Sequence, residues 1–157
     1  MAKDRLILKQ AVNIGVAVSV EDGVLVPVIP TADRQSLKDI SRMAKENAEH
    51  ARHGKLPATH KGTFTISSLG MHGIRSFLPI INPPECAILA VGTIAPRVTA
   101  ADGSIRIRDV MDLTLAADHR AVDGVIASEF LNEIKSVLEN LEKHHAFGPV
   151  AEPRNGS

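Results

Sequence analysis

Two segments with the periodicity of an amphipathic helix are separated by runs rich in β-branched residues, and this order constrains the fold most strongly. From Ser36 to His53 apolar residues recur three or four positions apart, which predicts a helix. The same spacing predicts a final helix from Val125 to Glu142. The β-branched runs predict strands within residues 5–29, 63–68, 86–98 and 105–117. Such a mixture predicts an α/β fold in which helices flank a mixed β-sheet.

The segments between these elements carry turn and cap signals. Glu21-Asp22-Gly23 predicts the turn of a hairpin, and Pro27 lacks the backbone donor of a central strand, which predicts an edge strand or a bulge. Ser36 begins a capping-box pattern, and Gly54 is typical of a left-handed helix stop. Residues 68–85 are interrupted by glycine and proline, and we expect a shaped loop there.

Length and composition exclude several classes of protein. The 157 residues favour one domain, which we place at residues 1–145, followed by a flexible tail at 146–157. Eighteen basic and eighteen acidic residues balance, and Trp and Tyr are absent, so we expect no nucleic-acid partner. No apolar run is long enough for a membrane span, and the start has no secretory signal pattern. The single cysteine fits a reducing compartment.

Three polar residues are candidates for chemistry. His119 follows a predicted strand in a loop, and a neutral imidazole can remove a proton near pH 7. Asp123 precedes the last helix, where it can cap free N–H groups as well as orient a site. Ser67 lies at a strand end before a glycine turn, where its hydroxyl could stabilise an oxyanion or satisfy local backbone groups. For each residue the structural interpretation and the functional one remain open at this point.

Other candidate sites have weaker support from the sequence. His50, His53 and His60 are spaced too loosely to define a metal site, and we expect none. Cys86 begins an apolar strand, which favours a buried, inert thiol. The stretch Gly70-Met71-His72-Gly73 fits neither a Walker loop nor a dinucleotide fingerprint.

Five motifs in fixed order resemble the catalytic domain of the dihydrolipoamide acyltransferases, the core (E2) components of 2-oxo acid dehydrogenase complexes. They are NIGVAVSVEDGVLVPVI, DRQSLKDIS, GTFTISSLGMHGI, IINPPECAILAVG and DHRAVDG, the last of which fits the family pattern DHRxxDG. The resemblance covers roughly residues 12–142, and family domains begin well upstream of the first motif. The chain is therefore similar to an N-terminally shortened catalytic domain.

The resemblance implies a fold like that of chloramphenicol acetyltransferase, a two-layer sandwich assembled as homotrimers that build a larger core. It implies that His119 takes the thiol proton of coenzyme A, that Ser67 binds the oxyanion, and that Asp123 holds the histidine loop through an ionic partner. The acyl donor is a lipoyl group on a separate lipoyl domain, other complex components are partners, and no metal is needed. The motifs look most like the acetyl-transferring type, of pyruvate or acetoin complexes. The resemblance also implies a cytoplasmic location, or the mitochondrial matrix in a eukaryote.

Two other functions stay open at the level of sequence. The first is a noncatalytic assembly module of such a complex, which the missing upstream part of the family domain favours. The second is a hydrolase with a Ser-His-Asp triad, which predicts a covalent acyl group on Ser67. No G-x-S-x-G nucleophile elbow supports the second.

Overall fold

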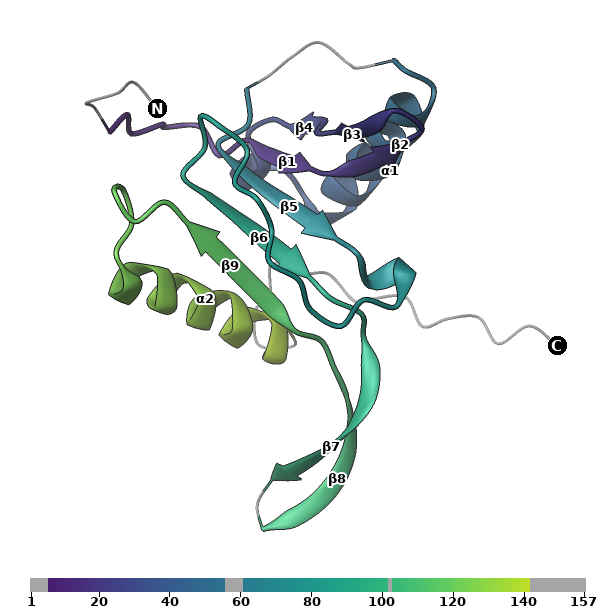
Figure 1. Ribbon diagram of the computed structural model, residues 1–157, viewed down its shortest axis with the longest axis vertical. Helices are drawn as coiled ribbons and strands as arrows, with labels where there is room; N and C mark the ends of the chain where they lie inside the picture. Colours follow the sequence, from purple (N-terminus) through teal and green to yellow (C-terminus); the bar gives the residue numbers. More distant parts are fainter. Residues whose placement is uncertain (1–5, 56–60, 102, 142–157) are drawn as a thin grey trace, which may run out of the picture.

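The computed structural model describes residues 6–55, 61–101 and 103–141 and has a mixed sheet at its centre (Figure 1). The sheet has five strands in the order β4-β1-β5-β6-β9. The strands are β1 (Ile14–Val16), β4 (Val28–Ile29), β5 (Phe64–Ser68), β6 (Ala87–Val91) and β9 (Leu113–Ala117). The inner strands β1, β5 and β6 are parallel, and the two edge strands are antiparallel to their neighbours. The predicted mixed sheet is confirmed.

The first hairpin forms where the sequence predicts it. Strands β2 (Val18–Val20) and β3 (Gly23–Leu25) are antiparallel, and the turn lies at Glu21-Asp22. Pro27 is buried between β3 and the two-residue edge strand β4, and Pro30 follows that strand directly. The expectation of an edge position for this proline-containing segment is confirmed.

The prediction of two long strands at residues 86–98 and 105–117 is wrong, because each of these segments breaks in the middle. The chain leaves the sheet after β6 and forms an antiparallel hairpin of β7 (Ala95–Ala101) and β8 (Ser104–Val110) before returning as β9. Gly92 lies at the break, where its N–H donates to the carbonyl of Asp112. A Cβ at Gly92 would collide with the carbonyl oxygen of Arg75, so the backbones cross there as only glycine allows. Figure 1 shows the hairpin extending away from the sheet.

Both predicted helices are present and begin at the predicted caps. Helix α1 spans Leu37–Arg52, and the Ser36 hydroxyl at its N-cap accepts from the backbone N–H of Asp39. Gly54 follows with a φ of 68°, which confirms the left-handed stop. Helix α2 spans Gly124–Glu139 and so ends earlier than predicted, because Asn140 already departs from helical geometry. Glu142 lies outside the described residues.

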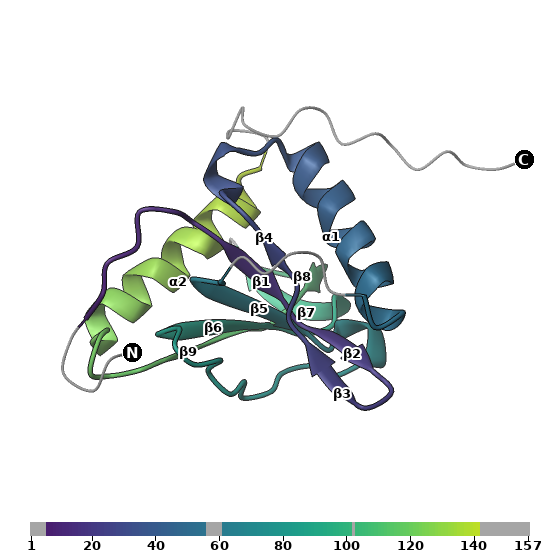
Figure 2. The same ribbon diagram turned by 90° about the horizontal axis from the view of Figure 1, so that it is seen from above.

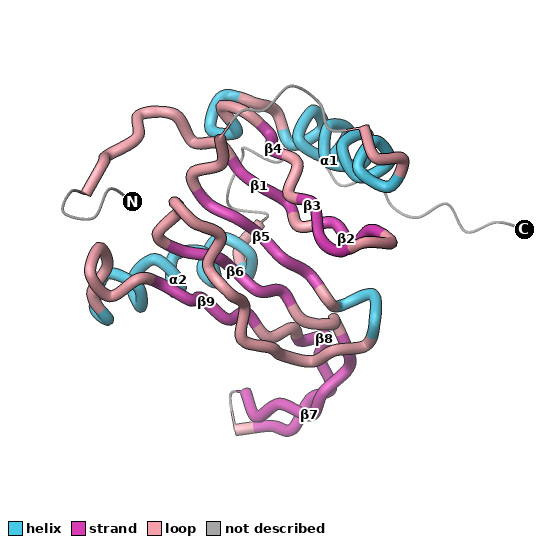
Figure 3. Tube along the Cα trace, turned by 45° about the horizontal axis from the view of Figure 1, so that its top comes forward, coloured by secondary structure: helices cyan, strands magenta, loops and turns pink. Residues whose placement is uncertain are grey.

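The helices cover one face of the sheet and a loop covers the other (Figure 2). Phe64 of β5 packs edge-to-face against Phe130 of α2, with ring centroids 5.7 Å apart. The next residue, Thr65, points to the opposite face, where its hydroxyl contacts Glu85 of the loop before β6. Figure 3 shows this loop, residues 69–86, running across the strands after the short 3₁₀ helix η2 (Gly70–His72). The arrangement is the two-layer sandwich, with the chloramphenicol acetyltransferase-like fold, that the resemblance implies.

The core lies at the centre of the sheet. Its most buried apolar residues come from the sheet, the first hairpin and α1: Val18, Ile29, Ala51, Ile88, Leu89 and Ala90. A further 3₁₀ turn, η1 (Ala32–Arg34), connects β4 to α1. No helix in the part of the chain that the structure describes is long and apolar enough to cross a membrane.

Candidate active site

Ser67 lies near the carboxyl end of β5, on the face of the sheet opposite the helices. It is paired with Ala90 of β6 and is half-buried. The neighbouring Ser68 hydroxyl accepts from the N–H of Gly70, and the N–H of Leu69 donates to the carbonyl of Val91. None of the hydrogen bonds of the described residues uses the Ser67 hydroxyl, which leaves it able to donate to a ligand.

A buried carboxylate fixes the loop that covers this face of the sheet. Thr65 is 1% exposed and donates its hydroxyl to Glu85 over 2.6 Å. Asn82 donates to the other carboxylate oxygen over 3.4 Å, and burial raises the pKa of Glu85 above its ordinary value. This contact could not be predicted from the sequence, because a Glu before a strand carries no signal of a distant threonine partner.

His119 lies in a tight turn after β9 with its side chain exposed. The N–H of Asp118 donates to the carbonyl of Cys86, and the N–H groups of Ala121 and Val122 donate back to the carbonyl of Asp118. The Asp118 carboxylate accepts from the backbone and the guanidinium of Arg120, at distances down to 2.6 Å. These bonds anchor the residues on both sides of His119.

Asp118 is a residue of the site that the sequence analysis missed. The bonds from Arg120 lower the pKa of Asp118 to about 2, so its carboxylate stays charged over the physiological range. The signal was present, since Asp118 and Arg120 flank His119 directly in the DHR triplet. The pairing itself depends on the turn that the backbone makes, and the sequence does not specify that turn.

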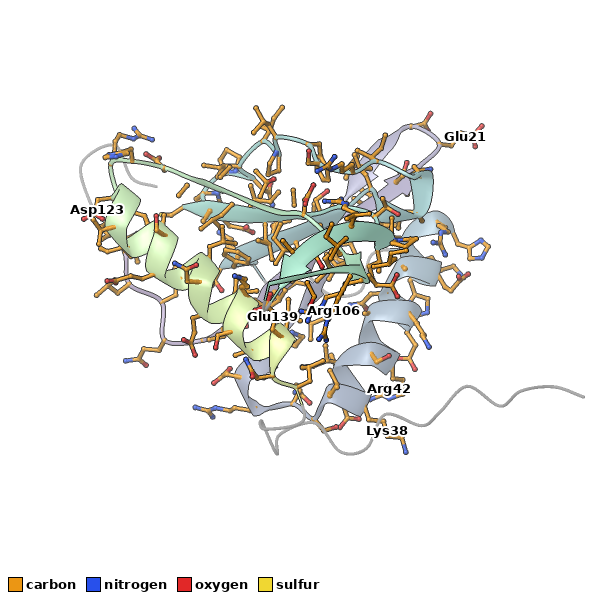
Figure 4. All side chains as sticks on the ribbon, turned by 90° about the horizontal axis from the view of Figure 1, so that it is seen from below. Glu21, Lys38, Arg42, Arg106, Asp123 and Glu139 are labelled. Carbon is orange, nitrogen blue, oxygen red and sulfur yellow. The ribbon has the colours of Figure 1, made fainter. Side chains whose placement is uncertain are left out.

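Asp123 caps α2. Its carboxylate oxygen accepts from the N–H groups of Val125 and Ile126, each over 2.9 Å. The capping interpretation is therefore confirmed. The expected ionic partner of Asp123 is not found among residues 6–55, 61–101 and 103–141. Figure 4 shows Asp123 at one end of α2, with Glu139 at the other end.

One chain does not bring Ser67 and His119 together. Along the sheet, Ser67 is level with Ala90 of β6 and with Thr114 of β9. His119 lies five residues beyond Thr114. At about 3.3 Å per strand residue and about 4.8 Å between strands, the two side chains are separated by roughly 15–20 Å. They lie toward opposite ends of the same sheet.

The remaining candidates do not form a site in the described chain. His50 and His53 are exposed near the end of α1, and His60 lies outside the described residues. Among the residues that can be described, no group of three His, Cys, Asp or Glu side chains is placed to hold a metal ion. Cys86 is half-buried rather than buried, because it precedes β6 at the end of the sheet, where cover is incomplete.

The mixed sheet, with its helices on one face and a loop across the other, has the chloramphenicol acetyltransferase-like fold, which sets the class of the protein. Residues 1–146 match the family model of 2-oxoacid dehydrogenases acyltransferase (catalytic domain), and the chain belongs to that family.

Curated relatives include acetyl-, succinyl- and branched-chain acyltransferase components. The acetyltransferase component of the Bacillus subtilis pyruvate dehydrogenase complex is 45% identical over 139 residues, which cover 87% of this chain and 31% of that protein. The corresponding component of Rickettsia bellii is 43% identical over 131 residues, which cover 82% of this chain and 31% of that protein. The chain thus spans about a third of the length of these relatives.

Solved structures share the fold. The dihydrolipoamide acetyltransferase of Azotobacter vinelandii superposes with a TM-score of 0.84 at 39% identity, covering 89% of this chain and 58% of that one. A probable dihydrolipoamide acetyltransferase of Listeria monocytogenes superposes with a TM-score of 0.86 at 40% identity. The match covers 92% of this chain and 63% of that one. In the Azotobacter enzyme, the roles of one serine, one histidine and one asparagine in the catalytic mechanism have been investigated.

Proposed function

We propose that this chain transfers an acyl group from S-acyl-dihydrolipoamide to coenzyme A, as the catalytic core of a 2-oxo acid dehydrogenase complex. The observation that carries the proposal is a pair of spacings. Ser67 and His119 are 52 residues apart, as are the serine and histidine studied in the Azotobacter enzyme. Asp123 follows His119 by four residues, as the asparagine follows the histidine there.

The reaction needs one proton transfer and one stabilised oxyanion. His119 accepts the thiol proton of coenzyme A, and the sulfur attacks the carbonyl carbon of the thioester. The Ser67 hydroxyl donates to the oxygen that becomes negative in the tetrahedral intermediate. The bond from carbon to the lipoyl sulfur then breaks, and that sulfur takes the proton from the imidazolium. The products are acyl-coenzyme A and dihydrolipoamide, and no step calls for a metal.

The active site of this proposal forms between two subunits of a homotrimer. The separation of Ser67 from His119 within one chain supports this arrangement, because a second copy must supply the missing partner. The hairpin β7–β8 supports it too, since Val98, Ile105 and Ile107 are 70%, 80% and 74% exposed on one face. One solved relative is the cubic core of a pyruvate dehydrogenase complex, which fits trimers that build a larger core.

The test of the site is acyl-coenzyme A formation by the purified assembly, supplied with an acylated lipoyl domain. We expect His119→Ala to lower kcat by about 10²–10⁴-fold and Ser67→Ala by about 10²–10³-fold. His50→Ala, which removes an exposed imidazole from α1, should keep the full rate. Full activity in His119→Ala would remove the proposed base.

Mixed assemblies test whether the site lies between subunits. When the inactive Ser67→Ala and His119→Ala chains are unfolded together and reassembled, some interfaces join an intact serine to an intact histidine. We expect part of the activity to return in the mixture, well above the residual rate of either variant alone. Failure to regain activity, in mixtures shown by mass spectrometry to contain both chains, would contradict an intersubunit site.

The two competing functions predict different results. A noncatalytic assembly module would form the oligomer and bind partner subunits without binding coenzyme A in calorimetry. A hydrolase would accumulate an acyl group on Ser67 that mass spectrometry detects after incubation with an activated ester. We expect coenzyme A binding and no acyl-serine.

We propose the acetyl group as the preferred acyl group. The support is the likeness of the motifs around residues 68–85 to the acetyl-transferring type. Rates with acetyl-, succinyl- and isobutyryl-dihydrolipoamide test the choice, and a succinyl preference would overturn it. The location that accompanies this proposal is the cytoplasm, or the mitochondrial matrix in a eukaryote; one relative, from Dictyostelium discoideum, is named as mitochondrial.

A further inference from the structure

The β7–β8 hairpin makes its hydrogen-bonded contacts with the body of the protein at its base, while farther along it lines a cavity with the end of α2. Its two strands pair along their full length, from Ala95 opposite Val110 to Ala101 opposite Ser104. No other helix or strand of the described chain makes extensive contact with either of them. The direction in which the hairpin projects is therefore set where its two ends leave the sheet.

One carboxylate joins three segments at that base. Asp112, between β8 and β9, accepts two hydrogen bonds from the guanidinium of Arg97 in β7, over 2.8 and 3.3 Å. It also accepts one from Arg75, in the loop that covers the sheet, over 3.0 Å. Arg97 and Asp112 are 21% and 32% exposed, so this pair is partly shielded from solvent. The bidentate geometry fixes orientation as well as distance.

Backbone contacts continue this clamp, which we define as Arg75, Arg97 and Asp112 with the backbone of Gly92. The N–H of Gly92 donates to the carbonyl of Asp112, and the N–H of Thr93 donates to the carbonyl of Ile74. The loop held in this way starts directly after the Ser67 strand. The clamp thus ties the hairpin to the end of the sheet that carries Ser67.

We propose that Asp112 is a positioning residue, whose clamp fixes the angle of the β7–β8 hairpin relative to the strand end that carries Ser67. This inference depends on the proposed function, because the exposed face of the hairpin is the surface offered to a neighbouring subunit. In the proposed trimer, the same neighbour supplies the His119 that works with Ser67. A change in the hairpin angle therefore shifts the base of one subunit relative to the oxyanion donor of the other. A misplacement of about 1 Å can cost about a hundredfold in rate.

Hydrogen exchange tests the clamp without reference to activity. In the intact assembly, Asp112→Asn keeps the size of the side chain but loses the charge that binds both arginines. We expect about tenfold faster amide exchange at Gly92 and Thr93, with unchanged protection in the β5–β6 ladder. Asp109→Asn, which removes a neighbouring exposed charge that forms no ion pair in the described chain, should leave exchange unchanged. Unchanged exchange in Asp112→Asn would overturn the inference.

Kinetics test the positioning role. We expect Asp112→Asn to lower kcat by about tenfold or more with the KM for coenzyme A unchanged, Asp112→Glu to recover most of the rate, and Asp109→Asn to match the wild type. A general loss of folded protein would not be corrected by a glutamate that keeps the charge. If the wild-type assembly turns over and Asp112→Asn matches it, this inference alone fails. If the wild type forms no acyl-coenzyme A, the proposed function fails and the positioning role falls with it.

Discussion

Strands β6 and β8 differ in how far the described chain covers them. Strand β6 is apolar on both faces, and Ile88 and Leu89, which point to opposite faces, are 5% and 6% exposed. Strand β8 alternates isoleucine with arginine, a pattern typical of a strand with one buried face. Yet Ile105 and Ile107 are 80% and 74% exposed. The described residues therefore complete a core at the sheet but leave the apolar face of the hairpin uncovered.

The two proposed reacting groups also differ in how far they are covered. Ser67 lies in β5, which has a neighbouring strand on both sides, and is half-buried. His119 is exposed in the turn after β9, at the end of the sheet away from the hairpin. The serine is therefore held rigidly, and the histidine is accessible to another molecule.

The largest expected effect is on the free energy of unfolding, which should respond differently to truncation in β6 and in β8. Leu89→Ala should lower the free energy of unfolding by about 2–5 kcal/mol, because the cavity opens in the packed sheet. Ile107→Ala should cost less than about 0.5 kcal/mol in dilute protein, since its side chain contacts mainly solvent there. Urea unfolding followed by circular dichroism measures both.

Protein concentration sharpens this test. The cost of Leu89→Ala should not change on dilution, whereas the cost of Ile107→Ala should grow as subunits associate, because its face is then covered. Equal losses in the free energy of unfolding for the two variants at every concentration would show that β6 and β8 do not differ in cover.

A smaller effect is expected at Asp123, the N-cap of α2, which follows the turn that carries His119. Asp123→Ala should lower the free energy of unfolding by about 1 kcal/mol, because two helix N–H groups lose their acceptor. Asp123→Asn should retain the stability, since asparagine caps equally well and the Azotobacter enzyme has asparagine at this spacing. If the asparagine variant is as unstable as the alanine variant, charge rather than capping is the role of Asp123.

The smallest expected effect concerns the buried carboxylate of Glu85, on the face of the sheet that the loop covers. Burial raises the pKa of Glu85 above 4.5, so the folded protein holds this proton more tightly than the unfolded chain does. Stability should therefore decrease as pH rises from about 4.5 through the raised pKa of Glu85. Glu85→Gln should remove this decrease in the free energy of unfolding, which urea unfolding at a series of pH values measures. An unaltered pH profile in Glu85→Gln would contradict the assignment.

The sequence predicted those parts of the fold that depend on local signals. The helix after Ser36 and the cap at Asp123 were correct, because a side chain bonds to N–H groups two or three residues away. The break at Gly92 was missed, because it depends on the backbone of Arg75, which approaches from another segment. A β-branched run looks the same whether it continues in a sheet or turns out of it.

The candidate site shows the same limit. Ser67, His119 and Asp123 were identified from motifs, and Asp123 also from its capping position. Their distance from one another was not predictable, because it depends on the order and direction of β5, β6 and β9. The contact between Thr65 and Glu85 was equally invisible, since it crosses from a strand to a loop.

The two margins of the sheet differ in their capacity to accept a further strand. At one margin β4 has two residues with a proline on each side, and proline offers no N–H to a newcomer. At the other margin β9 offers five residues free of proline. A foreign strand therefore finds more backbone partners beside β9 than beside β4, and joining of two copies through their β4 margins is disfavoured.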